Sequence, residues 1–178
     1  REGLRKSMNL ISVRMVQQGI APAEQVKRTA KRMGITTEIR AVDALALGTS
    51  EVIPLEMVSA YAAYANKGVY SKPFAITRIE DRYGNIIKDY FPDREEVLNE
   101  ETAYLMTSLL QTVMDRGTGG SARWKYKFNR PAAGKTGTTQ GWSDAWFVGF
   151  TPQIAAGAWF GVDDFRVPLG PGQDGARS

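Results

Sequence analysis

A six-residue string in the last third of the chain, residues 134–139, reads Gly-Lys-Thr-Gly-Thr-Thr and combines a cation with hydroxyls and glycines. A phosphate-binding P-loop uses such residues, because its glycines let backbone amides surround a phosphate whose charge a lysine neutralises. That motif also requires a glycine five positions before Gly134, where this chain has Asn129. Pro131 removes an amide donor and no helix pattern follows the string, so a nucleotide site is disfavoured.

The same string contains Lys-Thr-Gly, an element that serine acyl-transferases combine with a Ser-x-x-Lys and a Ser-x-Asn element. Because Gly137 has no side chain, a substrate can lie along the strand as an additional antiparallel partner. Lys135 adds positive potential, and Thr136 and Thr138 offer hydroxyls to a carboxylate. The backbone amide of Thr138 can face a developing oxyanion. Taken alone, the triplet is also compatible with an ordinary turn.

Ser7-Met8-Asn9 supplies a Ser-x-Asn element near the start of the chain. In that interpretation Ser7 transfers a proton and Asn9 holds an amide of the substrate. Such a triplet arises by chance in roughly every second or third chain of this size. Ser7 or Asn9 would also suit the cap of a following helix. The residues alone leave both interpretations open.

Composition restricts the other chemistries. The 178 residues include neither histidine nor cysteine, which excludes the commonest general base, soft metal ligands, thiol nucleophiles and disulfides. We therefore expect no metal and no cofactor, and Asp163 and Asp164 fit an exposed strand end better than a metal site. The net charge of +4 is modest, and the basic cluster within residues 27–32 has the spacing of a solvated helix face. An anionic polymer or membrane surface is the lesser alternative for that cluster, and no nucleic-acid partner is expected.

Helical periodicity ending at a glycine predicts three helices in the first part of the chain, over residues 8–19, 22–34 and 54–68. The last two also begin at a proline. A longer helix is expected after Asn99, which is a good cap. Glu100 and Glu101 then lie in the first turn, where the helix dipole favours anions, and Gly117 follows the end of the helix. A glycine-rich loop occupies residues 116–121.

Short β-prone runs predict a hairpin over residues 75–90, with its turn at 83–85, and three further strands at 132–138, 145–150 and 154–162. The last two strands are expected to be antiparallel because a short turn joins them. Residues 145–162 are uncharged and long enough for a membrane span. The turn signal Thr151-Pro152-Gln153 interrupts them and favours two buried strands, with Trp142, Trp146 and Trp159 in strand packing. Residues 170–175 are expected to form a loop.

Four blocks of the sequence resemble class A penicillin-binding proteins in order and spacing. They are residues 4–9, residues 47–52 with 54–57, residues 134–139 with 144–150, and residues 159–163. The loop at 116–119 is similar to this family as well. The resemblance covers nearly the whole chain. It implies an α+β fold of the penicillin-binding protein and serine β-lactamase type, in which an antiparallel sheet packs with helices.

The resemblance also implies a peptidoglycan D,D-transpeptidase, which cross-links stem peptides through a serine acyl-enzyme and binds β-lactam antibiotics. The implied catalytic residues are Ser7, Asn9 and Lys135, and the implied substrate-binding residues are Thr136, Gly137 and Thr138. The implied partners are stem peptides, the lipid-linked precursor and β-lactams. The whole protein would also be a peptidoglycan glycosyltransferase, held in the cell membrane by a segment outside this chain, with this domain on the outer side.

No serine of this chain has a lysine three positions later. In the family a Ser-x-x-Lys element upstream of Ser-x-Asn holds the nucleophile. We therefore expect residues 1–178 to be a partial transpeptidase domain, with the nucleophile-bearing part and a final C-terminal helix outside it and the fold incomplete at both ends. Two alternatives remain. One is a D,D-carboxypeptidase or serine β-lactamase that uses water as acceptor, and the other is a non-catalytic module that holds cell-wall peptide.

Overall fold

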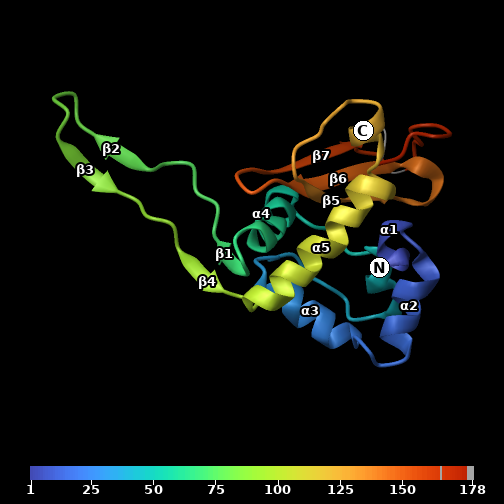
Figure 1. Ribbon diagram of the computed structural model, residues 1–178. Helices are drawn as coiled ribbons and strands as arrows, with labels where there is room; N and C mark the ends of the chain where they lie inside the picture. Colours follow the sequence, from blue (N-terminus) through green and yellow to red (C-terminus); the bar gives the residue numbers. More distant parts are fainter. Residues whose placement is uncertain (165, 176–178) are drawn as a thin grey trace.

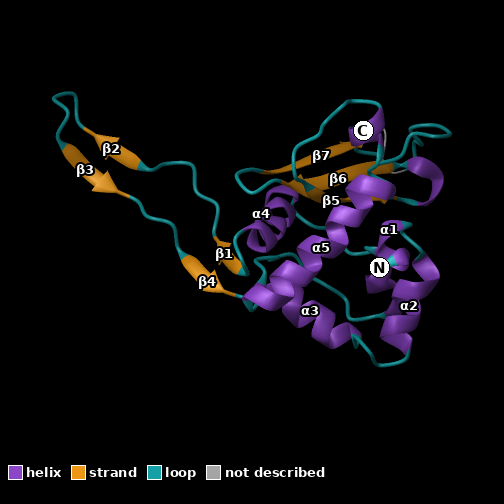
Figure 2. Cartoon of the chain, viewed as in Figure 1, coloured by secondary structure: helices purple, strands orange, loops and turns teal. Residues whose placement is uncertain are grey.

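Residues 1–164 and 166–175 are described by a computed structural model of the chain (Figure 1). The α-helices are α1 (Glu2–Arg5), α2 (Asn9–Gln17), α3 (Ala23–Arg32), α4 (Pro54–Ala65), α5 (Glu100–Arg116) and α6 (Ser121–Trp124), and the 3₁₀ helices are η1 (Asp43–Leu47) and η2 (Gln140–Trp142). The strands are β1 (Val69–Ser71), β2 (Arg78–Glu80), β3 (Ile86–Asp89), β4 (Arg94–Glu96), β5 (Ala133–Thr138), β6 (Asp144–Phe150) and β7 (Ala155–Gly161). Figure 2 shows a three-stranded sheet with most of the helices to one side of it and a separate two-stranded arm. This arrangement confirms the predicted α+β class.

The four predicted helices all form, as α2, α3, α4 and α5. Asn99 caps α5 as expected, since its Oδ1 accepts a hydrogen bond of 2.9 Å from the amide of Thr102. The predicted cap of α2 by Ser7 or Asn9 is wrong. Met8 holds the cap position with an extended backbone, and no side chain makes the cap bond. Sequence periodicity missed α1 and η1 because segments of four or five residues are too short to show it.

The sheet has the strand order β5-β6-β7, and both neighbouring pairs are antiparallel. The uncharged run at 145–162 thus forms strands β6 and β7, as predicted, joined by a turn in which the amide of Thr151 donates to the carbonyl of Ile154 at 2.8 Å. Within the described residues, no helix has the length and hydropathy needed to cross a membrane. Since β5 pairs only with β6, its other side is an open edge of the described sheet.

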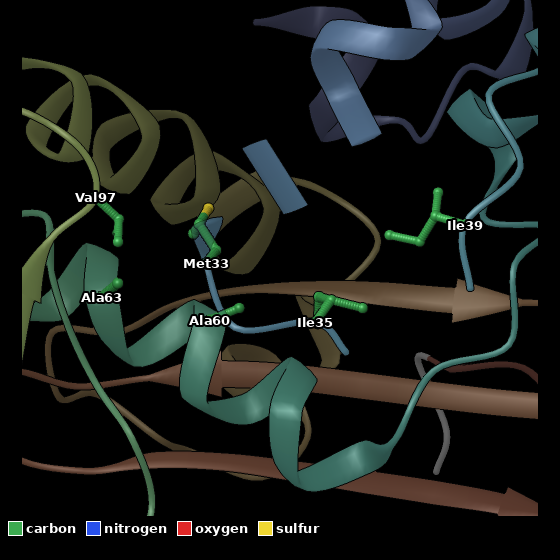
Figure 3. Packing of buried hydrophobic residues seen from close by; sticks show 6 residues of the cluster. All are labelled: Met33, Ile35, Ile39, Ala60, Ala63 and Val97. Atoms are coloured by element: carbon green, nitrogen blue, oxygen red, sulfur yellow. The ribbon is translucent and has the colours of Figure 1, made fainter. Parts of the chain in front are cut away.

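Two buried clusters hold the helices in place. The first joins α3 and its following loop to α4, where Ala60 and Ala63 face Met33 (Figure 3). The second joins α5 to the sheet through Leu110, Ala133 and Phe150, with Tyr61 and Tyr64 packed against it. Because Ala133 is the first residue of β5, the second cluster fixes the position of α5 relative to that strand.

The arm, residues 69–96, projects away from the sheet and helices (Figure 1). It contains two antiparallel pairs, β1 with β4 at its base and β2 with β3 at its tip. The predicted hairpin is confirmed, and its turn is stabilised by Asp81, whose Oδ1 accepts hydrogen bonds from the amides of Tyr83 and Asn85. The base pair β1–β4 was not predicted, because its strands have three residues each.

Candidate active site

Ser7 and Lys135 lie side by side although they are 128 residues apart in sequence. Lys135 Nζ donates a hydrogen bond of 2.8 Å to Ser7 Oγ. The packing of α1 and α5 against each other and of α5 against β5 brings the two segments to this position. The structure therefore joins the Ser-x-Asn and Lys-Thr-Gly elements, as the two-element interpretation requires.

Lys135 is half-buried on β5. Its Nζ also donates to the carbonyl oxygen of Thr136, at 2.7 Å. Burial lowers the pKa of its ammonium group below the ordinary value, because removal from water disfavours the charged form. The site therefore holds a cation that releases its proton more readily than an exposed lysine does.

Ser7 has a left-handed backbone with a φ of 52°, which is uncommon for a residue other than glycine. The surrounding turn enforces it, since the amide of Ser7 donates to Leu4 and the amide of Met8 to Gly3, at 3.2 and 2.8 Å. Strained backbone of this kind is concentrated at functional sites. Asn9 begins α2 two residues later, and its exposed side chain makes no hydrogen bond within the described part of the chain.

Within the described residues, the outer edge of β5 pairs with no other strand. The amide of Thr139 donates to the carbonyl of Asp144, at 3.1 Å, just beyond the pair Thr138–Ala145. Because hydrogen-bonded and non-hydrogen-bonded pairs alternate in an antiparallel ladder, the amide of Thr138 points away from β6. A Cβ built on Gly137 would meet a single atom within 4 Å, the Cβ of Trp146 at 3.3 Å. The space over Gly137 on the face of Lys135 is therefore open in the described chain.

The hydroxyls of Thr136 and Thr138 both have protein partners. Thr136 is 9% exposed, and its Oγ1 lies 2.6 Å from Oγ1 of Thr118. Thr138 Oγ1 accepts a hydrogen bond of 3.1 Å from the amide of Gly175. Each hydroxyl has more than one hydrogen-bonding position, so these bonds leave room for a further partner. The predicted contact of both threonines with a carboxylate remains a prediction.

Sequence reasoning gave no role to two segments that contact the site. The loop after α5 reaches it through Thr118, whose amide donates to the carbonyl of Arg5 at 3.2 Å. The predicted C-terminal loop reaches it through Gly175, where a Cβ would overlap backbone atoms of Gly137 and Trp146. The signals in sequence were the glycines flanking Thr118, because close backbone approach often requires glycine, and the resemblance of residues 116–119 to the family.

The structure also bears on the predictions made for the P-loop alternative, the tryptophans and the aspartates after the last strand. β5 is followed by the three-residue 3₁₀ helix η2 and the antiparallel β6 rather than by an α-helix, so the α-helix N-terminus of a P-loop is absent at this string. Strand packing is wrong for Trp142, which is in η2 and 41% exposed. Trp159 lies on β7 opposite Trp146 of β6. Although Trp159 is exposed, its Nε1 donates to Oδ1 of Asp144 on β6 at 2.8 Å, so its contacts lie within the sheet. Asp163 and Asp164 are exposed beyond β7, as expected. Among the described residues no group of acidic side chains is placed to hold a metal ion.

Comparison with known proteins agrees with this geometry. A family model described as the penicillin binding protein transpeptidase domain matches residues 1–163. Penicillin-binding protein 1A of Aquifex aeolicus is 37% identical over 177 residues, which are 99% of this chain and 23% of that protein. Penicillin-binding protein 2D of Bacillus subtilis is 38% identical over 141 residues, which are 76% of this chain and 20% of that protein. The chain thus spans about a quarter or less of the length of these relatives.

Solved structures show the same fold. The crystal structure of penicillin-binding protein 1A from Haemophilus influenzae superposes with a TM-score of 0.91 at 27% identity, over 99% of this chain and 32% of that one. PonA1 from Mycobacterium tuberculosis, in complex with penicillin V, has a TM-score of 0.83 at 24% identity, over 98% of this chain and 51% of that one. The predicted fold type and family resemblance are therefore confirmed. The chain belongs to the penicillin-binding protein transpeptidase family.

Proposed function

We propose that residues 1–178 are part of the transpeptidase domain of a peptidoglycan D,D-transpeptidase, which cross-links stem peptides through a serine acyl-enzyme. The main support is the hydrogen bond of 2.8 Å between Lys135 Nζ and Ser7 Oγ, beside a β5 edge that is open at Gly137. In this proposal a Ser-x-x-Lys element elsewhere in the protein supplies the nucleophile. The chain contributes the Ser-x-Asn and Lys-Thr-Gly parts of the site.

The reaction has two steps. The serine hydroxyl adds to the carbonyl carbon of the D-Ala-D-Ala peptide bond, the C–N bond breaks, and Ser7 passes a proton to the leaving D-alanine amine. An amine from a neighbouring stem peptide then attacks the ester, restores the serine hydroxyl and forms the cross-link. The amide of Thr138, which points to the open edge, is a donor for the oxyanion. Asn9 orients the substrate amide, and Thr136 and Thr138 bind the terminal carboxylate beside Lys135.

The proposed partners follow from this reaction. They are peptidoglycan stem peptides, the lipid-linked precursor and β-lactams, whose ring amide and carboxylate imitate the D-alanyl-D-alanine end. The complex of PonA1 with penicillin V supports the last of these. In the proposed whole protein a peptidoglycan glycosyltransferase and a membrane segment belong to other parts of the polypeptide, and this domain lies on the outer side of the membrane.

Labelling of the full-length protein with fluorescent penicillin tests the proposal. Lys135→Ala and Ser7→Ala should each lower the rate of acylation by about a hundredfold or more, with little change in the thermal midpoint. Lys72→Ala and Ser71→Ala, two substitutions of the same types at the base of the arm, should acylate like the wild type. The isolated 178-residue chain should form no labelled band. A labelled band from that chain would contradict the assignment of the nucleophile to another segment, and wild-type labelling of both site variants would reject the roles of Ser7 and Lys135.

A further inference from the structure

The loop after α5 contacts both chain segments that present the Ser7–Lys135 pair. Thr118 lies 2.6 Å from Thr136, oxygen to oxygen, and Thr136 is the residue after Lys135 on β5. The amide of Thr118 donates to the carbonyl of Arg5, two residues before Ser7. One residue thus contacts both halves of the site, although its own side chain is not part of either element.

A second hydrogen bond joins the Arg5 segment and the loop after α5, with donor and acceptor exchanged. The Arg5 guanidinium donates through Nη1 to the carbonyl of Arg116, at 3.0 Å, while the amide of Thr118 donates back to the carbonyl of Arg5. A Cβ on Gly117 would overlap that same carbonyl, so the close approach of the two segments requires glycine there. We call residues 116–118 together with Arg5 the clasp. Its reciprocal hydrogen bonds hold the Ser7 turn against the loop after α5, and the Thr118–Thr136 contact joins that loop to β5.

The pair of hydroxyls in the clasp has two possible proton arrangements. If Thr136 donates to Thr118, its single proton is used within the protein. If Thr118 donates to Thr136, the proton of Thr136 is free for another acceptor. A carboxylate held near the Lys135 ammonium would favour the second arrangement, because hydrogen bonds to a charged acceptor are stronger than those between neutral groups.

From this geometry we infer that Thr118 is a positioning residue, which donates to Thr136 so that Thr136 can donate its own proton to the carboxylate of the bound substrate. The inference rests on the proposed function, since it assumes a ligand with a carboxylate at the β5 edge. Thr118 acts through Thr136 and takes no part in the bond-making steps. Loss of its hydroxyl should therefore weaken recognition of carboxylate-bearing ligands selectively.

The test compares acylation of the full-length protein by penicillin and by penicillin methyl ester, which lacks the carboxylate. Thr118→Val removes the hydroxyl at nearly constant size. It should lower the ratio of the penicillin rate to the ester rate about tenfold, the loss expected for one hydrogen bond to a charged group. Thr118→Ser keeps a hydroxyl and should restore the ratio. Thr112→Val is the matched control, because the Thr112 hydroxyl donates to Leu109 on its own helix, and it should keep the wild-type ratio.

A second comparison separates positioning from simple loss of structure. Thr136→Val should lower the same ratio, and adding Thr118→Val to it should lower the ratio no further, because both residues act through one proton. Thr118→Ala provides the same measurement if the valine methyl disturbs the loop. An unchanged ratio in Thr118→Val, or equal losses with both probes, would overturn the inference while leaving the proposed function intact. A wild-type protein that neither probe acylates would reject the proposed function and this inference with it.

Discussion

The β5 edge and the arm are both built from antiparallel strands, yet different contacts hold them. At the β5 edge the hydrogen bonds join residues that are far apart in sequence, with separations of 128 for Lys135 and Ser7 and 111 for Arg5 and Arg116. In the arm they are local, such as those of Asp81 with Asn85 and of Arg78 with Asp89. The site therefore depends on correct packing of distant segments, whereas the arm depends on its own turn and cross-strand pairs.

The largest effect expected from this contrast concerns two glycines. Gly117→Val places a side chain against the carbonyl of Arg5, so it should open the clasp, destabilise the protein by about 2 kcal/mol and strongly reduce acylation by penicillin. Gly84→Ala is the comparison in the arm turn, where a Cβ meets no atom within 4 Å but φ is +83°. It should cost about 1 kcal/mol through backbone strain and leave acylation unchanged. Urea unfolding and labelling kinetics check both, and equal losses of acylation in the two variants would contradict the contrast.

The pH dependence of acylation provides the next test. Burial lowers the pKa of Lys135 below 10.5, so the folded site loses its positive charge before exposed lysines do. Acylation that needs this charge should fall as the pH rises through the lowered pKa. An arginine at this position keeps its charge to a much higher pH, so in Lys135→Arg acylation should decline only at a higher pH than in the wild type. Identical pH profiles for the two proteins would show that the Lys135 charge is not needed.

The same pKa shift predicts a change in stability. Between the lowered pKa and 10.5 the unfolded chain binds more protons at Lys135 than the folded chain does. The free energy of unfolding contributed by this residue should therefore rise with pH within that window. Lys135→Met should lack this contribution, so the difference in free energy of unfolding between wild type and variant should grow with pH. If the difference in free energy of unfolding stays constant across this pH window, the pKa of Lys135 is not lowered by folding.

A smaller effect is expected at the C-terminal loop. Gly175→Val should displace the backbone that lies against Gly137 and Trp146, and with it the hydrogen bond from the Gly175 amide to Thr138. Thr138 would then lose an orienting donor, and acylation should fall only a few-fold, as expected for one neutral hydrogen bond. Gly170→Ala in the same loop is the control, because a Cβ there meets no atom within 4 Å and its φ of +104° makes the effect one of local backbone strain. A wild-type rate in Gly175→Val would show that Thr138 does not need this donor.

The contrast also explains what could be predicted from sequence. The hairpin, the cap at Asn99 and strands β5 to β7 depend on local patterns, and each was predicted to within a few residues. The two elements of the site were recognised because Ser7 and Lys135 belong to short motifs. The clasp was not, since it depends on where the end of α5 lies relative to Arg5, a distance that no local pattern encodes. The left-handed turn at Ser7 was not predicted either. The triplet alone left a helix cap and a Ser-x-Asn element open, and the contact that distinguishes them comes from a lysine 128 residues away.

The smallest effect is expected in the arm, and it tests most directly whether the arm and the β5 edge are independent. Arg78 makes ion pairs at the tip with the half-buried Asp89 at 2.7 Å and with the exposed Glu80 at 3.4 Å, and Arg78 itself is exposed. Exposed pairs of this kind contribute little, because water and salt screen them. Arg78→Ala should therefore leave acylation and the thermal midpoint of the full-length protein within experimental error. A clear loss of acylation in Arg78→Ala would mean that the arm affects the β5 edge, which would contradict the independence of the two regions.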